Sequence, residues 1–432
     1  MSSMNFKVHE HIIPASHIRE LPNALAVEEG TPEATLHLAV KQYVPLDNTD
    51  PQPGDITVIA LHCNSFTKEV YEPLWDDLVA SLPSGTKIRS IWMADIAQQG
   101  ASYVLNEQKL ADGVSWDDHG RDLLHMINHF RDQMTAPMFG IGHSMGGTQL
   151  IGLCKLHPRL FHAVAFLDGW FAINFQPIDR KGFWKRSTTR KDRFPSLAAV
   201  RKGYEKAPLF KSWDQRVFQR YMDTAFRELP TMLHPDGDGV ALTTPTATEM
   251  FTTTRANIDR INLNPKEATR LDRLTYPDMV YDLPQTWPYY MNQPTGAGKY
   301  LPHLRPRALF LYGSKGSVAR PEWQKENVEH TGTSDGGSGG QRLGCVHDGK
   351  IVGGHFFPFE NPNGTAERLG TWLGAEQIVW REEKKELERR FRMDRTPEQR
   401  QRFPKEYMEV TEKWAKKPDA ETTAKPRKDS KL

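Results

Sequence analysis

Residues 139–150 read FGIGHSMGGTQL, which sets one serine between glycines, after an apolar run and before a helical pattern. Gly142, Ser144 and Gly146 fit the pattern G-x-S-x-G between a predicted strand and a predicted helix. A serine on such a turn is held in a strained backbone conformation, and larger side chains two residues away would collide with the turn. We therefore predict that Gly142 and Gly146 remove these collisions and that Ser144 is a nucleophile exposed at the carboxyl edge of a sheet.

Strand and helix patterns alternate on both sides of this turn. Residues 55–66 and 87–102 each contain an apolar run that ends in polar residues, and residues 161–170 form a similar run after the turn. This spacing requires crossover connections and predicts a mostly parallel α/β sheet. Two alternating segments, residues 6–15 and 35–44, predict an antiparallel pair near the N-terminus.

The alternation stops in a long central region that is rich in Trp, Arg, Pro and Thr and contains helical patterns. It returns in a strand pattern near residue 306, and a long charged helix is expected over residues 365–392. We therefore predict four parts. They are a first core segment (1–169), a helical cap insertion (170–302), a second core segment (303–392) and a charged C-terminal tail (393–432).

Composition limits the function classes. The chain has 432 residues and a formal net charge of only +2, which argues against a nucleic-acid-binding surface. It has no apolar run of the roughly 18 residues that a membrane span needs, and charges and a proline interrupt the N-terminus where a secretory signal would be apolar. The three cysteines show neither a disulfide nor a zinc-site pattern, so we expect a reducing intracellular compartment.

The final tripeptide narrows that compartment. Ser430, Lys431 and Leu432 form the C-terminal signal that the peroxisomal import receptor reads. The residues before it are polar and rich in Lys, Pro and Thr, so we expect an accessible tail. The sequence predicts a protein of the peroxisomal matrix that meets acyl-CoAs and other activated acyl groups.

A nucleophilic serine needs a base to accept its proton and a group to orient that base. In this chain order the base is expected in the loop after the last strand, and His355 in IVGGHFFPFENP lies there after two glycines. His347 is the nearest competitor, whereas His143 lies within the turn and is expected to point away from the nucleophile. We predict that His355 is the base.

The orienting acid is expected at a strand end. The loop GSKGSVARP after the strand near residue 306 contains no carboxylate, although an acid is usual at that place. Asp168 ends the strand that follows the nucleophile's helix, from which an acid can reach the same histidine nitrogen. We predict Asp168 as the acid, with Asp335, Asp348 and Glu360 as alternatives.

The negative charge that develops on an attacked carbonyl oxygen needs two preorganised N–H donors. Met145, directly after the nucleophile, supplies one of them, and the second is expected from either Asn64 or Ser65 in the loop after the first buried strand. Cys63 in that loop is a less favoured nucleophile because Ser144 is present. Asp95 ends the next strand and is expected to have a structural role, in which it binds loop amides.

The chain resembles the α/β-hydrolase superfamily over roughly residues 35–380. The features that carry the resemblance are ALHCNSFTKEVYEPLWDDL, GIGHSMGGTQL, the aspartate at a strand end and the terminal SKL. More closely, these motifs are similar to fungal peroxisomal hydrolases of host-selective toxin biosynthesis clusters and to the yeast peroxisomal lipase. The resemblance implies an α/β-hydrolase fold with a helical cap, and it implies a role in secondary metabolism. His-Cys in place of the usual His-Gly before Asn64 is the main departure, and it bears on the oxyanion geometry.

These residues lead to the hypothesis of a serine hydrolase that cleaves an acyl ester or an acyl-CoA-like thioester without a metal or an organic cofactor. An acyltransferase or cyclase that uses the same acyl-enzyme is the alternative, since the two differ only in cap shape and water access. A non-catalytic binding protein on a hydrolase fold is disfavoured, because such proteins usually lack the nucleophile or the base, and this chain has both.

Overall fold

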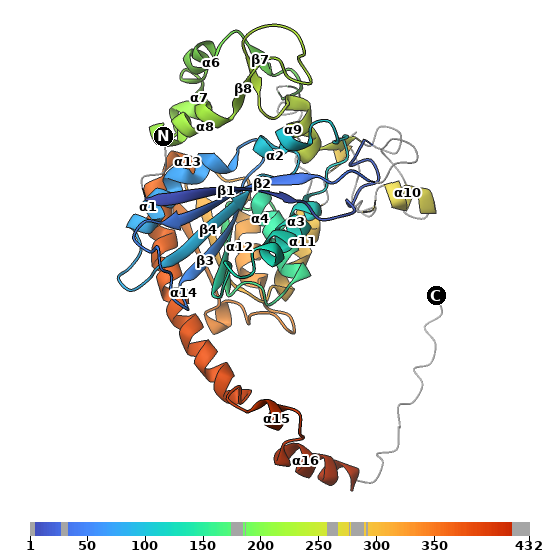
Figure 1. Ribbon diagram of the computed structural model, residues 1–432, viewed down its shortest axis with the longest axis vertical. Coiled ribbons are helices and arrows are strands. Elements are labelled where there is room, and N and C mark those ends of the chain that lie inside the picture. Colours follow the sequence, from blue (N-terminus) through green and yellow to red (C-terminus); the bar gives the residue numbers. More distant parts are fainter. Residues whose placement is uncertain are drawn as a thin grey trace. The chain divides into compact units, whose positions relative to one another are not determined.

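The computed structural model of the chain describes residues 5–26, 33–173, 185, 187–256, 267–275, 277, 289–290 and 293–416 (Figure 1). The chain divides into two compact units, Met1–Ile378 and Val379–Leu432. The predicted targeting signal, Ser430, Lys431 and Leu432, lies outside the described residues.

A large, mostly parallel sheet forms the centre of the first unit. Its eight strands follow the order β1-β2-β4-β3-β5-β6-β12-β13. All neighbouring strands from β4 to β13 are parallel, whereas β2 pairs antiparallel with both β1 and β4. The strands are β1 (Phe6–Pro14), β2 (His37–Pro45), β3 (Ile56–Leu61), β4 (Ile88–Ala94), β5 (Met138–His143), β6 (Ala163–Leu167), β12 (Arg307–Gly313) and β13 (Val346–Ile351). The predicted antiparallel pair and the predicted parallel sheet are both confirmed.

Each strand contributes to two apolar cores, one on each face of the sheet, because successive side chains of a strand point to opposite faces. In β3, for example, Val58 and Ala60 belong to one core, and Ile59 and Leu61 belong to the other. Both faces are covered, which explains why β3 and β6 are buried at every position.

Helices supply the two covering layers (Figure 1). One core includes residues of α1 and α14, and the other includes residues of α3, α4 and α12. The helices around the sheet are η1 (Lys68–Tyr71), α1 (Glu72–Ala80), α2 (Gly100–Asn106), α3 (Trp116–His129), α4 (Met145–Leu156), η2 (Leu301–His303), α12 (Pro321–His330), η3 (Gln341–Leu343), α13 (Phe357–Glu360) and α14 (Pro362–Arg390). The long charged helix expected over residues 365–392 is confirmed as α14.

Helix α3 illustrates how local sequence sets these elements. Ser115 caps its N-terminus by accepting a hydrogen bond from the N–H of Asp117, and that acidic residue lies in the first turn, where the helix dipole favours negative charge. Leu123, Met126 and Ile127 follow at helical spacing and are buried against the sheet. The cap and the apolar stripe together determine where the helix begins and which face it buries.

The segment between β6 and β12 carries most of the remaining elements and includes the predicted cap. Its helices are α6 (Leu197–Tyr204), α7 (Pro208–Lys211), α8 (Gln215–Thr224), α9 (Thr246–Thr253), α10 (Arg270–Thr275) and α11 (Gln293–Tyr300). Its strands are β7 (Arg193–Phe194), β8 (Phe226–Glu228), β9 (Val240–Leu242), β10 (Arg255–Ala256) and β11 (Tyr289–Tyr290).

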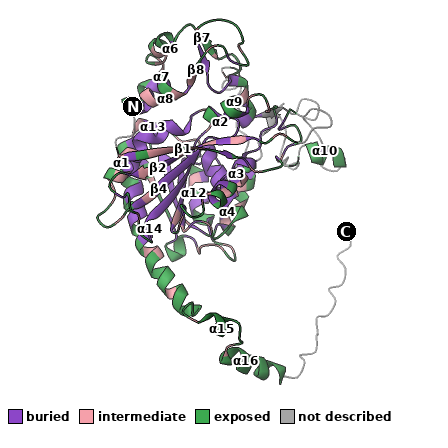
Figure 2. Ribbon diagram, viewed as in Figure 1, coloured by how far each residue is buried: buried purple, intermediate pink, exposed green. Residues whose placement is uncertain are grey.

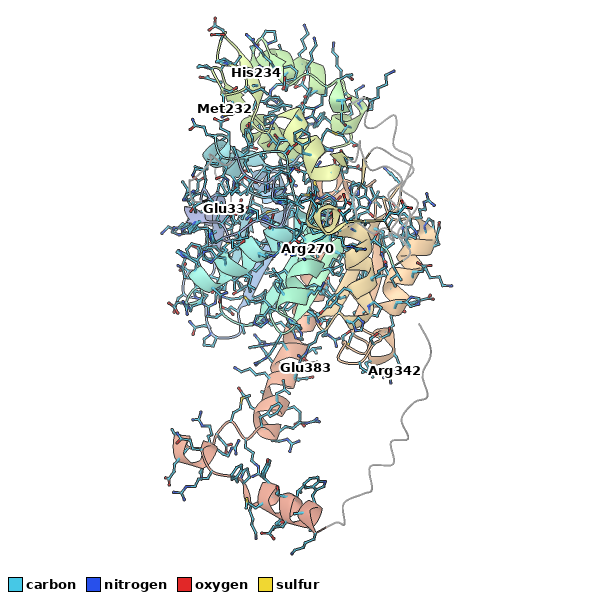
Figure 3. The ribbon with its side chains drawn as sticks, turned by 90° about the vertical axis from the view of Figure 1, so that its right-hand side faces the viewer. Glu33, Met232, His234, Arg270, Arg342 and Glu383 are labelled. Carbon is cyan, nitrogen blue, oxygen red and sulfur yellow. The ribbon has the colours of Figure 1, made fainter. Side chains whose placement is uncertain are left out.

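The cap region is not purely helical, because β7, β9 and β8 form a small three-stranded sheet. The sequence of residues 213–229 has a helical pattern throughout, but α8 ends at Thr224. The following residues of β8 pair with β9 instead. In the loop between β8 and β9, Met232 is exposed at the outer end of this region (Figure 3).

The second unit contains the end of α14 together with α15 (Pro397–Arg400) and α16 (Lys405–Ala415). Neither α15 nor α16 has a buried residue, in contrast to the strands of the central sheet (Figure 2). No helix in the described ranges combines the length and the apolar character that crossing a membrane requires.

Candidate active site

Ser144 lies on the sharp turn that the sequence predicted. Strand β5 ends at His143, helix α4 begins at Met145, and the serine between them has φ 54° and ψ −116°. Positive φ is unusual for a residue with a side chain, so the turn stores backbone strain at this position. Ser144 lies at the carboxyl edge of the sheet, where the first turn of α4 leaves its N–H groups without helical partners. Contrary to the prediction, Ser144 is not exposed there but is buried, with 5% of its surface accessible.

The space at the two glycines of the turn is too small for a side chain, as predicted. A Cβ atom on Gly142 would lie 2.5 Å from the carbonyl oxygen of Gly146. A Cβ atom on Gly146 would lie 2.4 Å from the carbonyl oxygen of Leu61 in β3. Since both obstacles are backbone atoms of packed elements, neither position accommodates a larger residue.

Three predicted site residues form one continuous chain of hydrogen bonds. The Ser144 Oγ atom lies 3.0 Å from Nε2 of His355, and Nδ1 of the same ring lies 2.8 Å from Oδ2 of Asp168. The Asp168 side chain is fully buried, whereas the His355 side chain is 19% exposed. Residues separated by more than 180 positions are thereby brought into contact, in an arrangement that can move a proton from the serine to the histidine.

Asp168 is held from the neighbouring strand end. It directly follows β6, has φ 44°, and donates its own N–H to the carbonyl oxygen of Leu311 in β12 at 2.7 Å. Its carboxylate accepts hydrogen bonds from the Ser317 hydroxyl and, at 3.2 Å, from the N–H of Val318. The loop after β12, which contains no carboxylate of its own, thus orients the acid that β6 supplies.

The alternative acids and the alternative base lie elsewhere. Asp335, Asp348 and His347 are exposed, and Glu360 accepts a hydrogen bond from the N–H of Gly354 at 2.8 Å. Within the described residues, none of the three alternative carboxylates makes a hydrogen bond or ion pair with His355, so Asp168 is the carboxylate that this ring contacts.

Residues 62–66 follow β3 and lie beside the turn that carries Ser144. We call them the oxyanion loop, after the role that the sequence predicts for Asn64 or Ser65. In this loop the N–H of Ser65 donates to Oε1 of Gln99 at 3.0 Å. The N–H of Asn64 has no acceptor among the described residues. The geometry therefore favours Asn64 over Ser65 as the partner of Met145, whose N–H belongs to the first turn of α4.

A buried tyrosine and a buried histidine link the oxyanion loop to His355. The N–H of Cys63 donates to the Tyr71 hydroxyl at 2.9 Å, and this hydroxyl lies 2.8 Å from Nδ1 of His143. The other ring nitrogen of His143 lies 3.0 Å from the carbonyl oxygen of His355 and donates to it. Burial, together with the neighbouring His355, holds the pKa of His143 well below its usual range, so His143 stays neutral.

Cys63, the less favoured nucleophile, is also buried. Burial raises the pKa of the Cys63 thiol to about 12, which disfavours a thiolate nucleophile.

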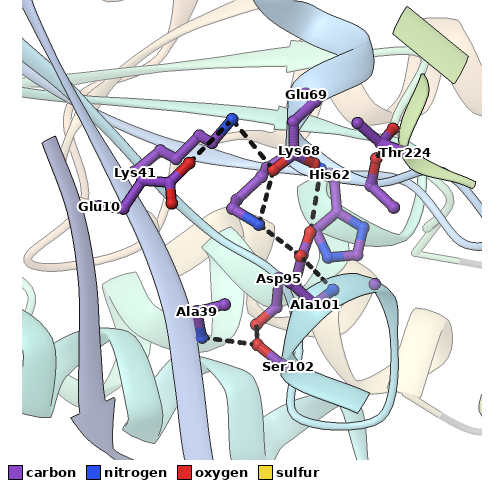
Figure 4. A network of polar contacts seen from close by, with 12 residues as sticks. Glu10, Ala39, Lys41, His62, Lys68, Glu69, Asp95, Ala101, Ser102 and Thr224 are labelled. Atoms are coloured by element: carbon purple, nitrogen blue, oxygen red, sulfur yellow. Dashed lines mark hydrogen bonds and ion pairs between the residues drawn. The ribbon is translucent and has the colours of Figure 1, made fainter. Parts of the chain in front are cut away.

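Asp95 has the structural role that was expected of it (Figure 4). Its carboxylate accepts hydrogen bonds from the N–H groups of Lys68 and Ala101, each at 2.9 Å, and from the Lys68 ammonium at 2.6 Å. Lys68 also pairs with Glu69, which in turn pairs with Lys41. Burial alone would raise the pKa of Glu69, but the two lysine charges outweigh it and hold that pKa below its usual range. This network fixes the exit of the oxyanion loop to the start of α2.

Aromatic side chains from the cap region pack beside the base. Phe66 of the oxyanion loop lies 5.1 Å from Trp213, 5.6 Å from Tyr221 and 5.3 Å from Phe356, measured between ring centroids. Trp213 also contacts Phe359 at 4.8 Å. Because Phe356 directly follows the base in sequence, this cluster joins the cap region, the oxyanion loop and the loop that carries His355.

Sequence reasoning missed the supporting residues Tyr71, Gln99, Lys68 and Ser317. Each acts through a side chain whose partner is distant in sequence or in another loop, and none belongs to a local motif. The polar residues in QQGAS after β4 were the only signal for Gln99, and they are not specific.

Comparisons with known proteins identify relatives of this chain. No family model matches the chain. It is 36% identical to the type I acyl-CoA thioesterase mpaH' of Penicillium brevicompactum, over 96% of this chain and 96% of the relative. It is 21% identical to the abhydrolase domain-containing protein AFT2-1 of Alternaria alternata, over 57% of this chain and 87% of the relative. The crystal structure of the peroxisomal α/β-hydrolase Lpx1 of Saccharomyces cerevisiae matches with a TM-score of 0.65 at 18% identity, covering 95% of this chain and 97% of that one.

The solved structure confirms the predicted α/β-hydrolase fold, and the relatives confirm the predicted resemblance to fungal and yeast hydrolases. The chain belongs to the α/β-hydrolase family that includes the fungal type I acyl-CoA thioesterases mpaH and mpaH'.

Proposed function

We propose that this protein is a serine thioesterase that hydrolyses an acyl-CoA thioester, with Ser144 as nucleophile, His355 as general base and acid, and Asp168 as the orienting acid. The observation that carries the proposal is the unbroken hydrogen-bond chain from Ser144 Oγ through His355 to the buried Asp168. The substrate class is supported by the relatives, which are named as acyl-CoA thioesterases and align along almost the whole chain.

In the first half of the reaction, Ser144 Oγ attacks the thioester carbonyl carbon while His355 Nε2 takes the hydroxyl proton. The carbonyl oxygen becomes an oxyanion, which accepts hydrogen bonds from the N–H groups of Met145 and Asn64. The carbon–sulfur bond then breaks, and His355 gives its proton to the departing thiolate. The products of this half are a free thiol and an acyl ester on Ser144.

In the second half, water attacks the acyl ester and His355 removes one of its protons. The second tetrahedral intermediate collapses, the bond to Ser144 Oγ breaks, and His355 returns the proton to the serine. Asp168 keeps the Nδ1 proton of His355 directed toward itself throughout, so that Nε2 faces the serine. The net reaction consumes one water and releases a carboxylic acid and a thiol.

The test is the release of free thiol from a panel of acyl-CoAs of graded chain length by purified protein. Wild-type protein is expected to turn over at least one member, and Ser144→Ala is expected to lose about 10⁶-fold of that rate. His347→Ala is the matched control, because His347 is an exposed histidine outside the Ser144–His355–Asp168 chain of hydrogen bonds. Absence of turnover on every acyl-CoA by folded protein would contradict the proposal, as would activity that survives in Ser144→Ala.

We also propose that the protein acts in the peroxisome. Support comes from Ser430-Lys431-Leu432, which matches the C-terminal import signal, and from the fold shared with the yeast peroxisomal hydrolase. A fluorescent protein fused to the N-terminus should be found in peroxisomes with the full chain and in the cytosol when residues 430–432 are deleted. An unchanged location after the deletion would argue against import through this tripeptide.

A further inference from the structure

Gln99 is a buried glutamine at the edge of the proposed oxyanion hole, and both the oxygen and the nitrogen of its side-chain amide make hydrogen bonds. It is 2% exposed and directly precedes α2. Its Oε1 accepts the N–H of Ser65 at 3.0 Å, and its Nε2 donates to Oδ1 of Asn64 at 2.5 Å and to the hydroxyl of Thr252 at 3.2 Å. Thr252 donates its own proton to the carbonyl oxygen of Thr248, so the donor and acceptor roles are consistent.

Two of these bonds determine the backbone of the oxyanion loop. Ser65 has φ 72°, a left-handed conformation that a serine adopts at a cost and keeps only when its surroundings hold it. The bond to Gln99 holds it there and occupies the Ser65 N–H. The preceding N–H, that of Asn64, is thereby the one left for a substrate oxyanion, while the Asn64 side chain is also held by Gln99.

The third bond reaches the cap region. Thr252 lies in α9, and this helix makes two further contacts with the same part of the core. The Asn64 amide donates to the carbonyl oxygen of Glu249 at 3.4 Å, and the Trp116 indole donates to the carbonyl oxygen of Thr252 at 2.5 Å. The N–H of Gly100, next to Gln99, donates to the hydroxyl of Thr244 just before α9 at 2.8 Å. Gln99 therefore contacts both the oxyanion loop and α9 of the cap region.

The loop that carries Gln99 is itself rigidly anchored. Asp95, four residues earlier, binds the N–H of Lys68 after the oxyanion loop and the N–H of Ala101 in α2 (Figure 4). The N–H of Ile96 donates to Nε2 of His62 at 3.0 Å. Because the backbone on both sides of Gln99 is held by these bonds, its side chain can hold Asn64 and Ser65 in one position.

We propose that Gln99 is a positioning residue that sets the Asn64 N–H in the oxyanion hole and ties it to α9 of the cap region. The inference rests on the proposed function, because it assigns Gln99 a part in stabilising the oxyanion of that reaction. Gln99 acts through Asn64 and Ser65, so its loss should weaken transition-state stabilisation more than ground-state binding.

The test compares Gln99→Met with Gln98→Met. Gln98 is the adjacent glutamine, is 3% exposed, and has an amide nitrogen with no hydrogen-bond partner among the described residues, so it is a matched control. Gln99→Met is expected to lower kcat on a short-chain acyl thioester by about 10-fold or more with little change in KM, since removing one oxyanion donor outright costs about 10²–10³-fold. Gln98→Met is expected to keep kcat within about 2-fold of the wild type, since its amide nitrogen binds no other described group.

A second measurement reports on the oxyanion directly. A trifluoromethyl ketone that adds to Ser144 forms a tetrahedral oxyanion, so its inhibition constant should rise in Gln99→Met by the same factor by which kcat/KM falls. A purely structural role would instead lower the thermal midpoint and leave both constants of the folded protein unchanged, and that result would overturn the inference.

Two more variants keep the test decisive if Gln99→Met does not fold. Gln99→Glu keeps the shape and the acceptor for the Ser65 N–H but loses both donations, and it is expected to lower kcat at unchanged KM. Thr252→Val removes the hydroxyl that Gln99 contacts in α9, together with the bond of that hydroxyl to the carbonyl oxygen of Thr248. It is expected to cost about 3-fold in kcat, since Gln99 loses one neutral hydrogen bond. Unchanged kcat in Gln99→Glu would overturn the inference.

Labelling of Ser144 by a fluorophosphonate in the wild-type protein separates the two hypotheses. An unlabelled wild type means that the proposed function fails. A labelled and active wild type with fully active Gln99 variants means that only the role of Gln99 fails.

Discussion

The strand ends of the core and the cap region above them are built differently. At the strand ends, Ser144 and Asp168 have positive φ and are almost completely buried. Their N–H groups donate to backbone oxygens of neighbouring strands, and their side chains bond to loops that follow strands. The described part of the cap region contributes short helices and a three-stranded sheet but no member of the Ser144–His355–Asp168 chain. It meets the core through the aromatic cluster around Trp213 and the hydrogen bonds of α9.

Under the proposed function, this difference assigns bond breaking and substrate coverage to separate parts of the chain. Changes at the strand ends should act on kcat, whereas changes in the cap region should act on stability and on the range of acyl groups accepted. The variants below test whether the two parts have these separate roles, and they are given in order of decreasing expected effect.

The largest effect is expected from Asp168→Asn. An amide of the same shape no longer favours the His355 tautomer with its proton on Nδ1, so kcat should fall about 10⁴-fold while the fold is kept. Acyl-CoA turnover and the thermal midpoint should be measured together. Activity within about 10-fold of the wild type would show that another group orients His355 and would break the assignment of chemistry to these strand ends.

Trp213→Ala is the corresponding change in the cap region. Trp213 is 3% exposed and packs on Phe66 and Phe359, so its loss should lower the free energy of unfolding by about 3 kcal/mol, which urea unfolding would measure. Turnover of a short acyl thioester by the folded variant should fall much less than in Asp168→Asn. Trp414→Ala, at a position that is 73% exposed, should leave stability unchanged. A loss of short-chain kcat as large as that of Asp168→Asn would show that cap and chemistry are not separable.

Tyr71→Phe tests the link between the oxyanion loop and the base. The variant leaves the buried N–H of Cys63 without its acceptor and removes the proton that His143 accepts, so kcat should fall about 10-fold with little change in KM. Tyr103→Phe, at another buried tyrosine, is the control and should retain wild-type kcat. Equal activity of the two variants would assign Tyr71 to packing alone.

The smallest effect concerns pH. His119 is buried, its ring nitrogens have no hydrogen-bond partner among the described residues, and burial, then His62 and Arg19, hold its pKa well below the usual range. The unfolded chain takes up a proton at His119 below about pH 6.5 and the folded chain does not, so stability is lost as the pH falls below that value.

His119→Leu removes this titration. Its free energy of unfolding should therefore decline less between pH 7 and pH 5 than that of the wild type, by about 1–2 kcal/mol. Urea unfolding at the two pH values measures the difference. Parallel declines in the two proteins would show that His119 does not contribute to the acid sensitivity of the core.

Much of the candidate site could be predicted from the sequence because its sequence signals are local. The turn around Ser144 has a five-residue pattern with a steric cause, and His355 and Asp168 were found by their places after strands in chain order. The sheet followed from apolar runs alternating with helical patterns, because strands with both faces covered must be apolar throughout. The end of α8 at Thr224 was not predicted, since pairing of the next residues with β9 overrides their helical pattern.

The sequence by itself determined the order of strands and helices along the chain and the sharp turn at Ser144, because these depend on residues adjacent in the chain. Only the tertiary structure decided which N–H of the oxyanion loop has no acceptor among the described residues, and which groups contact His355. Ser65 is engaged by Gln99, and His355 is reached by Tyr71 through His143, over separations of 34 and more than 200 residues. Such contacts have no local pattern, because they arise only when parallel strands bring the loops at their carboxyl ends to one edge of the sheet.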